Sequence, residues 1–251
     1  MAGDYRLSDR AWAAIEPLLP QNQPGARRVD DRRVISGIVH VLKSGCRWKD
    51  CPKVYGPPTT IYNRFNRWSR KGLWGRIFAE LVAQTEVPED LSIDSTAVRA
   101  HRSAHGGKGG RKVQCIGRSR GGPTTKIHAL TDSCGRLAAF LISPGNVADI
   151  TVAPALITAM PPTLRLIADK GYDANSLRAT LAQQRTEAVI PSTRSRKQAI
   201  PYDPVAYRDR NMIERAFCSL KDYRRVATRY DKLARNFLSA VAIAAVIIWW
   251  T

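Results

Sequence analysis

Apolar side chains recur every three or four residues over the first 85 positions, which is the spacing of helices with one buried face. Ser8 is a candidate N-cap for the first helix, and Gly45 and Gly72 are candidate helix breaks. The predicted helices cover residues 9–19, 31–44, 59–70 and 73–84. We therefore expect the N-terminal part of the chain to be helical.

Beyond a polar stretch at residues 86–90, the pattern changes to the two-residue alternation of strands. Leu91 and Ile93 alternate with polar residues, so the first strand is expected to present Asp94 on the opposite face. A second apolar run ends directly before Asp169. The further predicted strands cover residues 124–130, 137–143, 164–168 and 188–190, and the predicted helices cover 149–160, 174–184 and the segment after Asp203.

This order of strands and helices is that of a ribonuclease H-like sheet flanked by helices. If the strand that carries Asp94 lies beside the strand that ends at Asp169, the two carboxylates become neighbours. We therefore predict an α/β protein. An N-terminal all-α, helix-turn-helix-like domain over residues 1–86 would precede a ribonuclease H-like mixed-sheet domain over residues 87–251.

The helix predicted after Asp203 carries four polar residues on one face. Tyr207, Arg210, Glu214 and Lys221 project within an arc of roughly 60° at about 100° per residue. Such a face is often a solvated row of ion pairs. A single acid among cations also suits a metal ion that is held beside a phosphate backbone.

Three carboxylates that converge without histidine or cysteine would repel one another unless cations neutralise them. Asp94, Asp169 and Glu214 are the candidates, and hard oxygen ligands favour Mg²⁺ or Mn²⁺. Two such ions about 4 Å apart can activate an attacking hydroxyl and stabilise a leaving oxygen. Turn or helix-start positions explain the rival acids Asp132, Asp149 and Asp173.

The net charge of +19 indicates a polyanionic partner, with nucleic acid ahead of an anionic membrane surface. Residues 99–126 contain eight Lys and Arg, seven Gly and no acid. We expect this segment to be a mobile basic loop that touches phosphates, with a disordered linker as the alternative.

The five cysteines include no CxxC pair, which indicates free thiols in a reducing cytosol. A zinc site from His101, His105 and Cys115 is an alternative with irregular spacing. Charged residues interrupt any apolar start, so no signal peptide is expected. The apolar run at residues 237–250 is too short to span a bilayer and is expected to be a buried closing helix or a subunit contact. We therefore expect a cytoplasmic protein, nucleoid-associated when bound to DNA.

Several motifs together resemble the bacterial insertion-sequence DDE transposases. Tyr207 to Lys221 matches their YxxRxxxExxxxxxK signature. The segments SIDST around Asp94 and ADKGYDA around Asp169 look like their two Asp motifs. The stretch GRSRGGPTTKIHA and the region at residues 45–65 are also similar, so that the resemblance covers nearly the whole chain.

The resemblance implies a transposase that binds terminal inverted repeats, cleaves DNA at element ends and joins 3′-OH ends to target DNA. It implies that Asp94, Asp169 and Glu214 hold two Mg²⁺ or Mn²⁺ ions per active site. Lys221 would contact a DNA phosphate, and Tyr207 with Arg210 would hold the cleaved end or brace the Glu214 helix. Joining two ends requires two active sites, so a homodimer or larger assembly is expected on DNA.

Other DNA contacts are hypotheses from charge and position. Lys126 and His128 share one face of the second strand, and a structural histidine is an equal alternative for His128. Further candidates on the third helix and in the basic loop are Arg64, Arg67, Arg118 and Arg120. A basic helical scaffold is the alternative to a DNA-reading helix-turn-helix. For the whole protein, the alternatives are a non-catalytic DNA-binding regulator and a ribonuclease H-like nuclease or resolvase.

Overall fold

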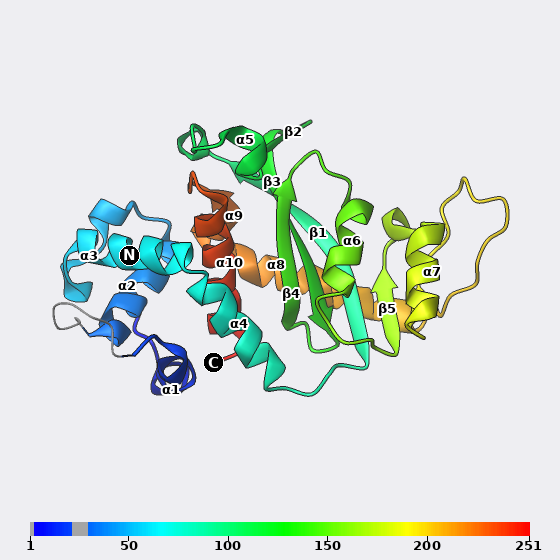
Figure 1. Ribbon diagram of the computed structural model, residues 1–251, viewed down its shortest axis with the longest axis horizontal. Coiled ribbons are helices and arrows are strands. Elements are labelled where there is room, and N and C mark those ends of the chain that lie inside the picture. Colours follow the sequence, from blue (N-terminus) through cyan, green and yellow to red (C-terminus); the bar gives the residue numbers. More distant parts are fainter. Residues whose placement is uncertain (1–2, 22–29) are drawn as a thin grey trace. The chain divides into compact units, whose positions relative to one another are not determined.

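The computed structural model describes residues 3–21 and 30–251, which divide into two compact units. The described residues up to Gln84 form the helical unit together with Ala100–Gly110 and Leu220–Thr251. Thr85–Arg99 and Arg111–Ser219 form the sheet unit. Figure 1 traces the elements of both units along the chain. The grouping departs from the predicted ranges, because residues 100–110 and 220–251 cluster with the N-terminal helices.

The helical unit begins with the helices that apolar spacing predicted. Ser8 Oγ accepts the backbone N–H of Ala11 at 3.1 Å and caps the first helix. Gly45 ends the second helix with a φ of +77°, which a glycine adopts without strain. The elements are α1 (Asp9–Ile15), α2 (Asp31–Ser44), α3 (Pro58–Arg70), α4 (Leu73–Ala83), α9 (Arg224–Ala227), β7 (Thr228–Arg229) and α10 (Ala234–Trp249).

α10 belongs to the core of the helical unit, where it packs against α4, α3 and α2. Its side chains from Phe237 to Val246 are buried almost continuously, with only Leu238 partly exposed. The expected buried closing helix is therefore confirmed, and it closes the N-terminal core. No helix within the described residues is long and apolar enough to cross a membrane.

The connection between α2 and α3 spans residues 45–57 and contains two 3-10 turns, Trp48–Asp50 and Lys53–Tyr55. A helix-turn-helix normally has a turn of about three or four residues. The helices themselves are confirmed, whereas DNA reading by α3 stays a prediction.

The sheet unit has the ribonuclease H-like strand order β4, β3, β1, β5, β6. β3 runs antiparallel to both β1 and β4, and β5 runs parallel to both β1 and β6. A short β2 extends the edge beside the start of β3. The strands are β1 (Asp90–Ala100), β2 (Gly117–Ser119), β3 (Gly122–Asp132), β4 (Leu137–Pro144), β5 (Arg165–Ala168) and β6 (Glu187–Val189).

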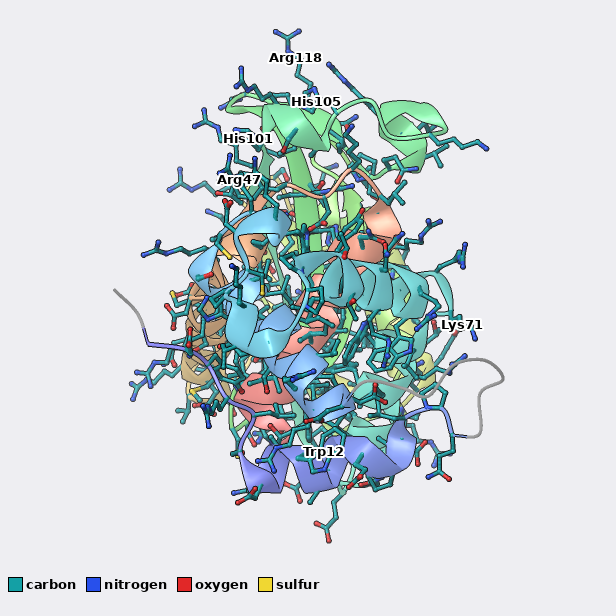
Figure 2. All side chains as sticks on the ribbon, turned by 90° about the vertical axis from the view of Figure 1, so that its left-hand side faces the viewer. Trp12, Arg47, Lys71, His101, His105 and Arg118 are labelled. Carbon is teal, nitrogen blue, oxygen red and sulfur yellow. The ribbon has the colours of Figure 1, made fainter. Side chains whose placement is uncertain are left out.

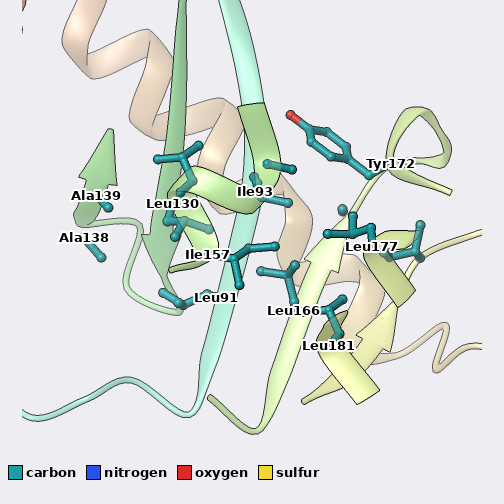
Figure 3. Close-up of a cluster of buried hydrophobic side chains, with 14 residues drawn as sticks. Leu91, Ile93, Leu130, Ala138, Ala139, Ile157, Leu166, Tyr172, Leu177 and Leu181 are labelled. Atoms are coloured by element: carbon teal, nitrogen blue, oxygen red, sulfur yellow. The ribbon is translucent and has the colours of Figure 1, made fainter. Parts of the chain in front are cut away.

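Helices cover both faces of this sheet. In Figure 1, α6 (Asp149–Ile157) lies in front of the strands and α8 (Asn211–Lys221) lies behind them. The apolar cluster on the α6 side also includes α7 (Asn175–Gln183), and Figure 3 shows its side chains between strands and helices. On the α8 side, Ile167, Val189 and Ala206 form a smaller cluster with Tyr207.

Residues 99–126 do not form the single loop that was expected from their composition. β1 continues to Ala100, a 3-10 turn covers Arg102–Ala104, α5 covers Gly110–Val113, and β2 follows. Ala100, Ala104 and Ile116 are buried, so a few apolar residues anchor an otherwise basic segment. The prediction of a mobile loop overlooked these anchors.

Candidate functional site

The register between two parallel strands brings Asp94 and Asp169 together. Ile93 and Ala168 are direct partners in the β1–β5 pairing, and both side chains lie in the cluster on the α6 side. Because successive residues of extended chain point to opposite faces, the next residues, Asp94 and Asp169, turn toward the α8 side. Asp169 then caps the 3-10 turn Lys170–Tyr172 by accepting the N–H of Gly171 at 2.8 Å. The condition under which the two carboxylates become neighbours, that these strands lie side by side, is met.

Asp94 is half-buried and has two partners. Its Oδ1 accepts the backbone N–H of Ser95 at 2.7 Å, and its Oδ2 accepts the Arg210 guanidinium at 3.1 Å. Burial raises the pKa of Asp94 above its usual value, and the nearby Asp169 carboxylate adds to this rise. The Ser95 N–H and the Arg210 guanidinium oppose it. The ionised form of Asp94 is therefore destabilised both by its burial and by the neighbouring carboxylate of Asp169.

Arg210 joins the acid on the sheet to the acid on α8. One terminal nitrogen donates to Asp94 and the other donates to Glu214. Its guanidinium also lies 6.0 Å from the centre of the Tyr207 ring. Tyr207 and Arg210 stand on a 3-10 turn, Ala206–Arg210, rather than on the α-helix itself. Asp203 Oδ1 accepts the N–H groups of Val205 and Ala206 at the start of this turn.

The donor set of the site fits a hard divalent cation, because it consists of carboxylates without thiol or imidazole. Within the described residues, no three His, Cys, Asp or Glu side chains lie close enough to hold a metal ion together. Between Asp94 and Glu214 stands the Arg210 cation instead. An ion shared by these two acids would have to take the place of that guanidinium.

Lys221 lies outside the sheet unit, because the chain from Leu220 onward clusters with the helical unit. Its contact with a DNA phosphate stays a prediction. His101 contacts Tyr230 and Ser103 Oγ within the helical unit, so the alternative of a zinc site receives no support there. The five cysteines all lie within the described residues, and none of them forms a disulfide.

Lys126 and His128 do share one face of β3, but both turn toward Asp149 at the start of α6. Lys126 Nζ donates to Asp149 Oδ1 and to the Val147 carbonyl, each at 2.9 Å. His128 is 1% exposed, its Nε2 lies 2.7 Å from Ser143 Oγ, and burial lowers its pKa to about 4. His128 is therefore a neutral structural histidine, and the hypothesis of a direct DNA contact does not fit its position.

Arg64 was a candidate DNA contact, but its side chain is buried. It forms an ion pair with Asp31 on α2, and its guanidinium lies 5.0 Å from the Trp68 ring centre. Only 5% of Arg64 is exposed, so its charge holds α2 and α3 together. The other candidates, Arg67, Arg118 and Arg120, are exposed and keep their predicted role as an expectation.

The rival acids have structural partners. Asp132 accepts two backbone N–H groups in the β3–β4 turn and pairs with Arg136. Asp173 has no exposed side-chain surface and pairs with Arg178 and Arg196. Asp149 pairs with Lys126 at the first turn of α6.

Tyr172 is a residue that the sequence did not single out. It lies within the ADKGYDA segment and is 2% exposed, and its hydroxyl has no hydrogen-bond partner among the described residues. Burial raises its pKa, and the carboxylates of Asp149, Asp94 and Asp169 raise it further. A buried phenol beside three acids could have been suspected only from its position next to Asp169.

The models of two protein families match this chain, one over its N-terminal part and the other over the rest. Residues 7–78 match "Putative transposase of IS4/5 family (DUF4096)", and residues 86–249 match "Transposase DDE domain". A Brucella ovis protein named "Putative transposase for insertion sequence element IS6501" is 35% identical over half of this chain and 98% of its own length. A Burkholderia cepacia protein named "Putative transposase for insertion sequence element IS402" is 28% identical over 52% of this chain and 65% of its own length.

Among solved structures, a piggyBac transposase synaptic complex with hairpin DNA aligns with 94% of this chain and 69% of its own chain. The TM-score is 0.52 at 14% sequence identity. This likeness concerns the fold.

Proposed function

Because this chain belongs to the DDE transposase family of insertion sequences, we propose that it binds terminal inverted repeats, cleaves DNA at element ends and joins the 3′-OH ends to target DNA. One observation carries the proposal. The β1–β5 register pairs Ile93 with Ala168, the residues directly before Asp94 and Asp169, and α8 carries Glu214. These are the three acids that the motifs single out.

Asp94, Asp169 and Glu214 would hold the divalent ions, Mg²⁺ or Mn²⁺, with two per site as the expectation from the family resemblance. When bound, such ions lower the pKa of an attacking water or 3′-hydroxyl and stabilise the leaving oxygen. The raised pKa of Asp94 supports this role, because a carboxylate that lacks sufficient neutralisation favours a cation nearby.

Arg210 would act as the cation of the metal-free site. Its two donated hydrogen bonds reduce the repulsion between Asp94 and Glu214, so that α8 can stay close to the sheet. After its release from the acids, the guanidinium would be free to bind a phosphate of the cleaved DNA end. Tyr207 supports the guanidinium from the preceding turn. Lys221 would add a further phosphate contact.

The test uses the purified full chain and a labelled duplex that ends in the inverted repeat of its own element, with and without Mg²⁺. Asp169→Asn is expected to keep DNA binding and to lose cleavage and joining by at least about 100-fold, the scale for removing one preorganised electrostatic group. Asp9→Asn is the matched control, because the Asp9 side chain is 95% exposed.

Cleavage that survives in Asp169→Asn would overturn the assignment of the acids. Binding without cleavage in the native chain would instead support a DNA-binding regulator, and cleavage without joining would support a nuclease. Two joined ends require two active sites, so the complex with paired ends should contain at least two copies of the chain. Light scattering of the purified complex measures this number.

A further inference from the structure

A cleft of about 610 Å³ lies within the helical unit, and all the residues that line it belong to that unit. Three stretches of chain line it: the turn and helix that carry Trp48 and Tyr62, the glycine-rich loop around Gly106, and the segment from Arg225 to Asn236. A volume of this size suits one small planar ligand or one nucleotide. It does not suit a double helix.

Planar groups form one wall of the cleft. The Arg225 guanidinium lies 5.4 Å from the centre of the Trp48 ring and 5.3 Å from that of Tyr230. Tyr62 extends the row at 5.5 Å from Trp48, and 38% of its surface is exposed. Aromatic rings and arginine planes are the groups on which unpaired bases stack in proteins.

Two buried acceptor oxygens belong to residues that line the cleft. Asp231 is 6% exposed and Asn236 is 4% exposed, and both line the cleft. Asp231 Oδ2 and Asn236 Oδ1 have no hydrogen-bond donor among the residues that the structure describes. Asn236 Nδ2 donates to Asn66 Oδ1 at 3.3 Å. Buried acceptors of this kind call for a ligand that brings N–H donors.

Cations stand at the mouth of the same cleft. Arg47 and Lys232 line it and are exposed, and Arg47 also pairs with the exposed Asp50. In Figure 2, Arg47 lies toward the upper end of the helical unit with His101 and His105, whereas Trp12 lies at its lower end. The cleft thus combines stacking surface, unmet acceptors and exposed positive charge. A phosphate, a base plane and a base edge with N–H donors would satisfy all three.

We propose that this cleft binds one unpaired nucleotide of DNA. The base stacks in the row of Trp48, Arg225 and Tyr230, its amino group points to Asp231 and Asn236, and its phosphate lies against the cations at the mouth. The site is separate from the three carboxylates, and binding there requires no strand cleavage. It would give the protein a preference for DNA with a displaced base, which the catalytic proposal alone does not predict.

The test measures binding of the full chain to two duplexes without divalent metal. One duplex is fully paired, and the other contains a single unpaired 2-aminopurine, a fluorescent base with an amino group. We expect the native chain to bind the second duplex about 10-fold more tightly and to quench its fluorescence by stacking. Trp48→Ala should abolish both effects and leave binding of the paired duplex nearly unchanged.

Tyr62→Ala is the second variant, because this exposed ring can be removed without disturbing the core that Trp48 shares with Phe65. It should weaken the preference for the unpaired base. Trp12→Ala, at the far end of the helical unit, should behave as the native chain. Asn236→Leu should reduce the discrimination between an unpaired amino-bearing base and an unpaired thymine.

Equal affinity of the native chain for both duplexes would overturn the proposal, as would quenching that survives in both Trp48→Ala and Tyr62→Ala. Because the assay contains no metal and scores no cleavage, its result does not depend on the catalytic proposal. A chain that cannot cleave DNA can still show the preference, and an active transposase can lack it.

Discussion

Arg210 is the residue on which the geometry of the candidate site depends. It touches the acid on β1 and the acid on α8, and it is itself about one-fifth exposed. Half-exposed ion pairs of this kind contribute modestly to stability, about 1 kcal/mol or less. The guanidinium of Arg210 thus neutralises the two carboxylates through ion pairs that are weak enough for another cation to replace it. This balance suits a site that exchanges one cation for another.

Removing that guanidinium should make the site a better metal site. In Arg210→Ala, Asp94 and Glu214 lose the cation with which a metal ion would compete. We expect the apparent affinity for Mg²⁺ to rise by about fivefold, the equivalent of about 1 kcal/mol of lost competition. The rise in melting temperature on adding Mg²⁺ measures it, because a ligand that binds the folded state stabilises that state.

Arg208→Ala is the matched control for this experiment. Arg208 is exposed and stands on the same 3-10 turn, but the acids of the site have Arg210 as their guanidinium partner. Its melting temperature should respond to Mg²⁺ as that of the native chain does. A response of Arg210→Ala equal to or smaller than the native response would show that Arg210 does not occupy the metal position.

At the scale of elements, the alternation of Ile93 and Asp94 and the apolar run before Asp169 predicted the two strands, and the order of elements suggested the arrangement in which they are neighbours. The two-residue alternation along a strand determines which face of the sheet each side chain lies on. The order of strands and helices along the chain favours parallel pairing of the two strands. The structure of residues 99–126 could not be predicted in this way. Its buried apolar residues, Ala100, Ala104 and Ile116, are too few to produce a periodic signal.

The sequence also could not predict the partners of several charged side chains. The placement of His128 and Lys126 on one strand face was correct, but their contact with Asp149 depends on how α6 docks onto the sheet. The buried Arg64 was misjudged for the same reason, since its partner Asp31 lies on another helix. Charge alone indicates a solvated or DNA-binding residue, and only tertiary packing distinguishes a buried ion pair.

The start of α7 depends on one buried acid that fixes the loop at residues 191–203. Asp173 accepts from Arg178, from Arg196 and from the Thr193 N–H, and its side chain is fully buried. Asp173→Asn should lower the free energy of unfolding at pH 7, since it leaves the guanidinium groups of Arg178 and Arg196 without a countercharge. Chemical denaturation followed by circular dichroism measures the loss.

The pH dependence of that loss has a definite sign. Hydrogen bonds from Arg196 hold the pKa of Asp173 well below its usual value of 3.8, so the native state favours the ionised form. The stabilisation is therefore complete above about pH 4 and declines as the pH falls below this value. The difference between Asp173→Asn and the native chain should shrink at pH 3. Asp209→Asn, which alters an exposed acid, should change little, and a difference that grows toward low pH would contradict this account.

At the scale of the whole molecule, the two units are not consecutive along the chain, because the helical unit is built from three separate stretches of sequence. The chain starts in the helical unit, builds the sheet unit and returns with Leu220–Thr251. The sequence suggested a boundary near residue 86, because the periodicity changes there. A local change of pattern cannot show that a helix more than 150 residues later completes the first core, since that contact depends only on tertiary packing.

The N-terminal segment should therefore not fold alone. In the isolated fragment 1–86, the apolar faces of α3 and α4 would lose α10, whose side chains Phe237, Val241 and Ala245 are fully buried. Three such residues contribute about 4–8 kcal/mol by burial, which is comparable to the whole stability of a small domain. Circular dichroism should show a broad, non-cooperative thermal transition for the fragment. A single polypeptide that joins residues 1–86 to 220–251 through a flexible linker is the control and should melt cooperatively. Cooperative melting of the fragment alone would show that the N-terminal helices form an independent domain.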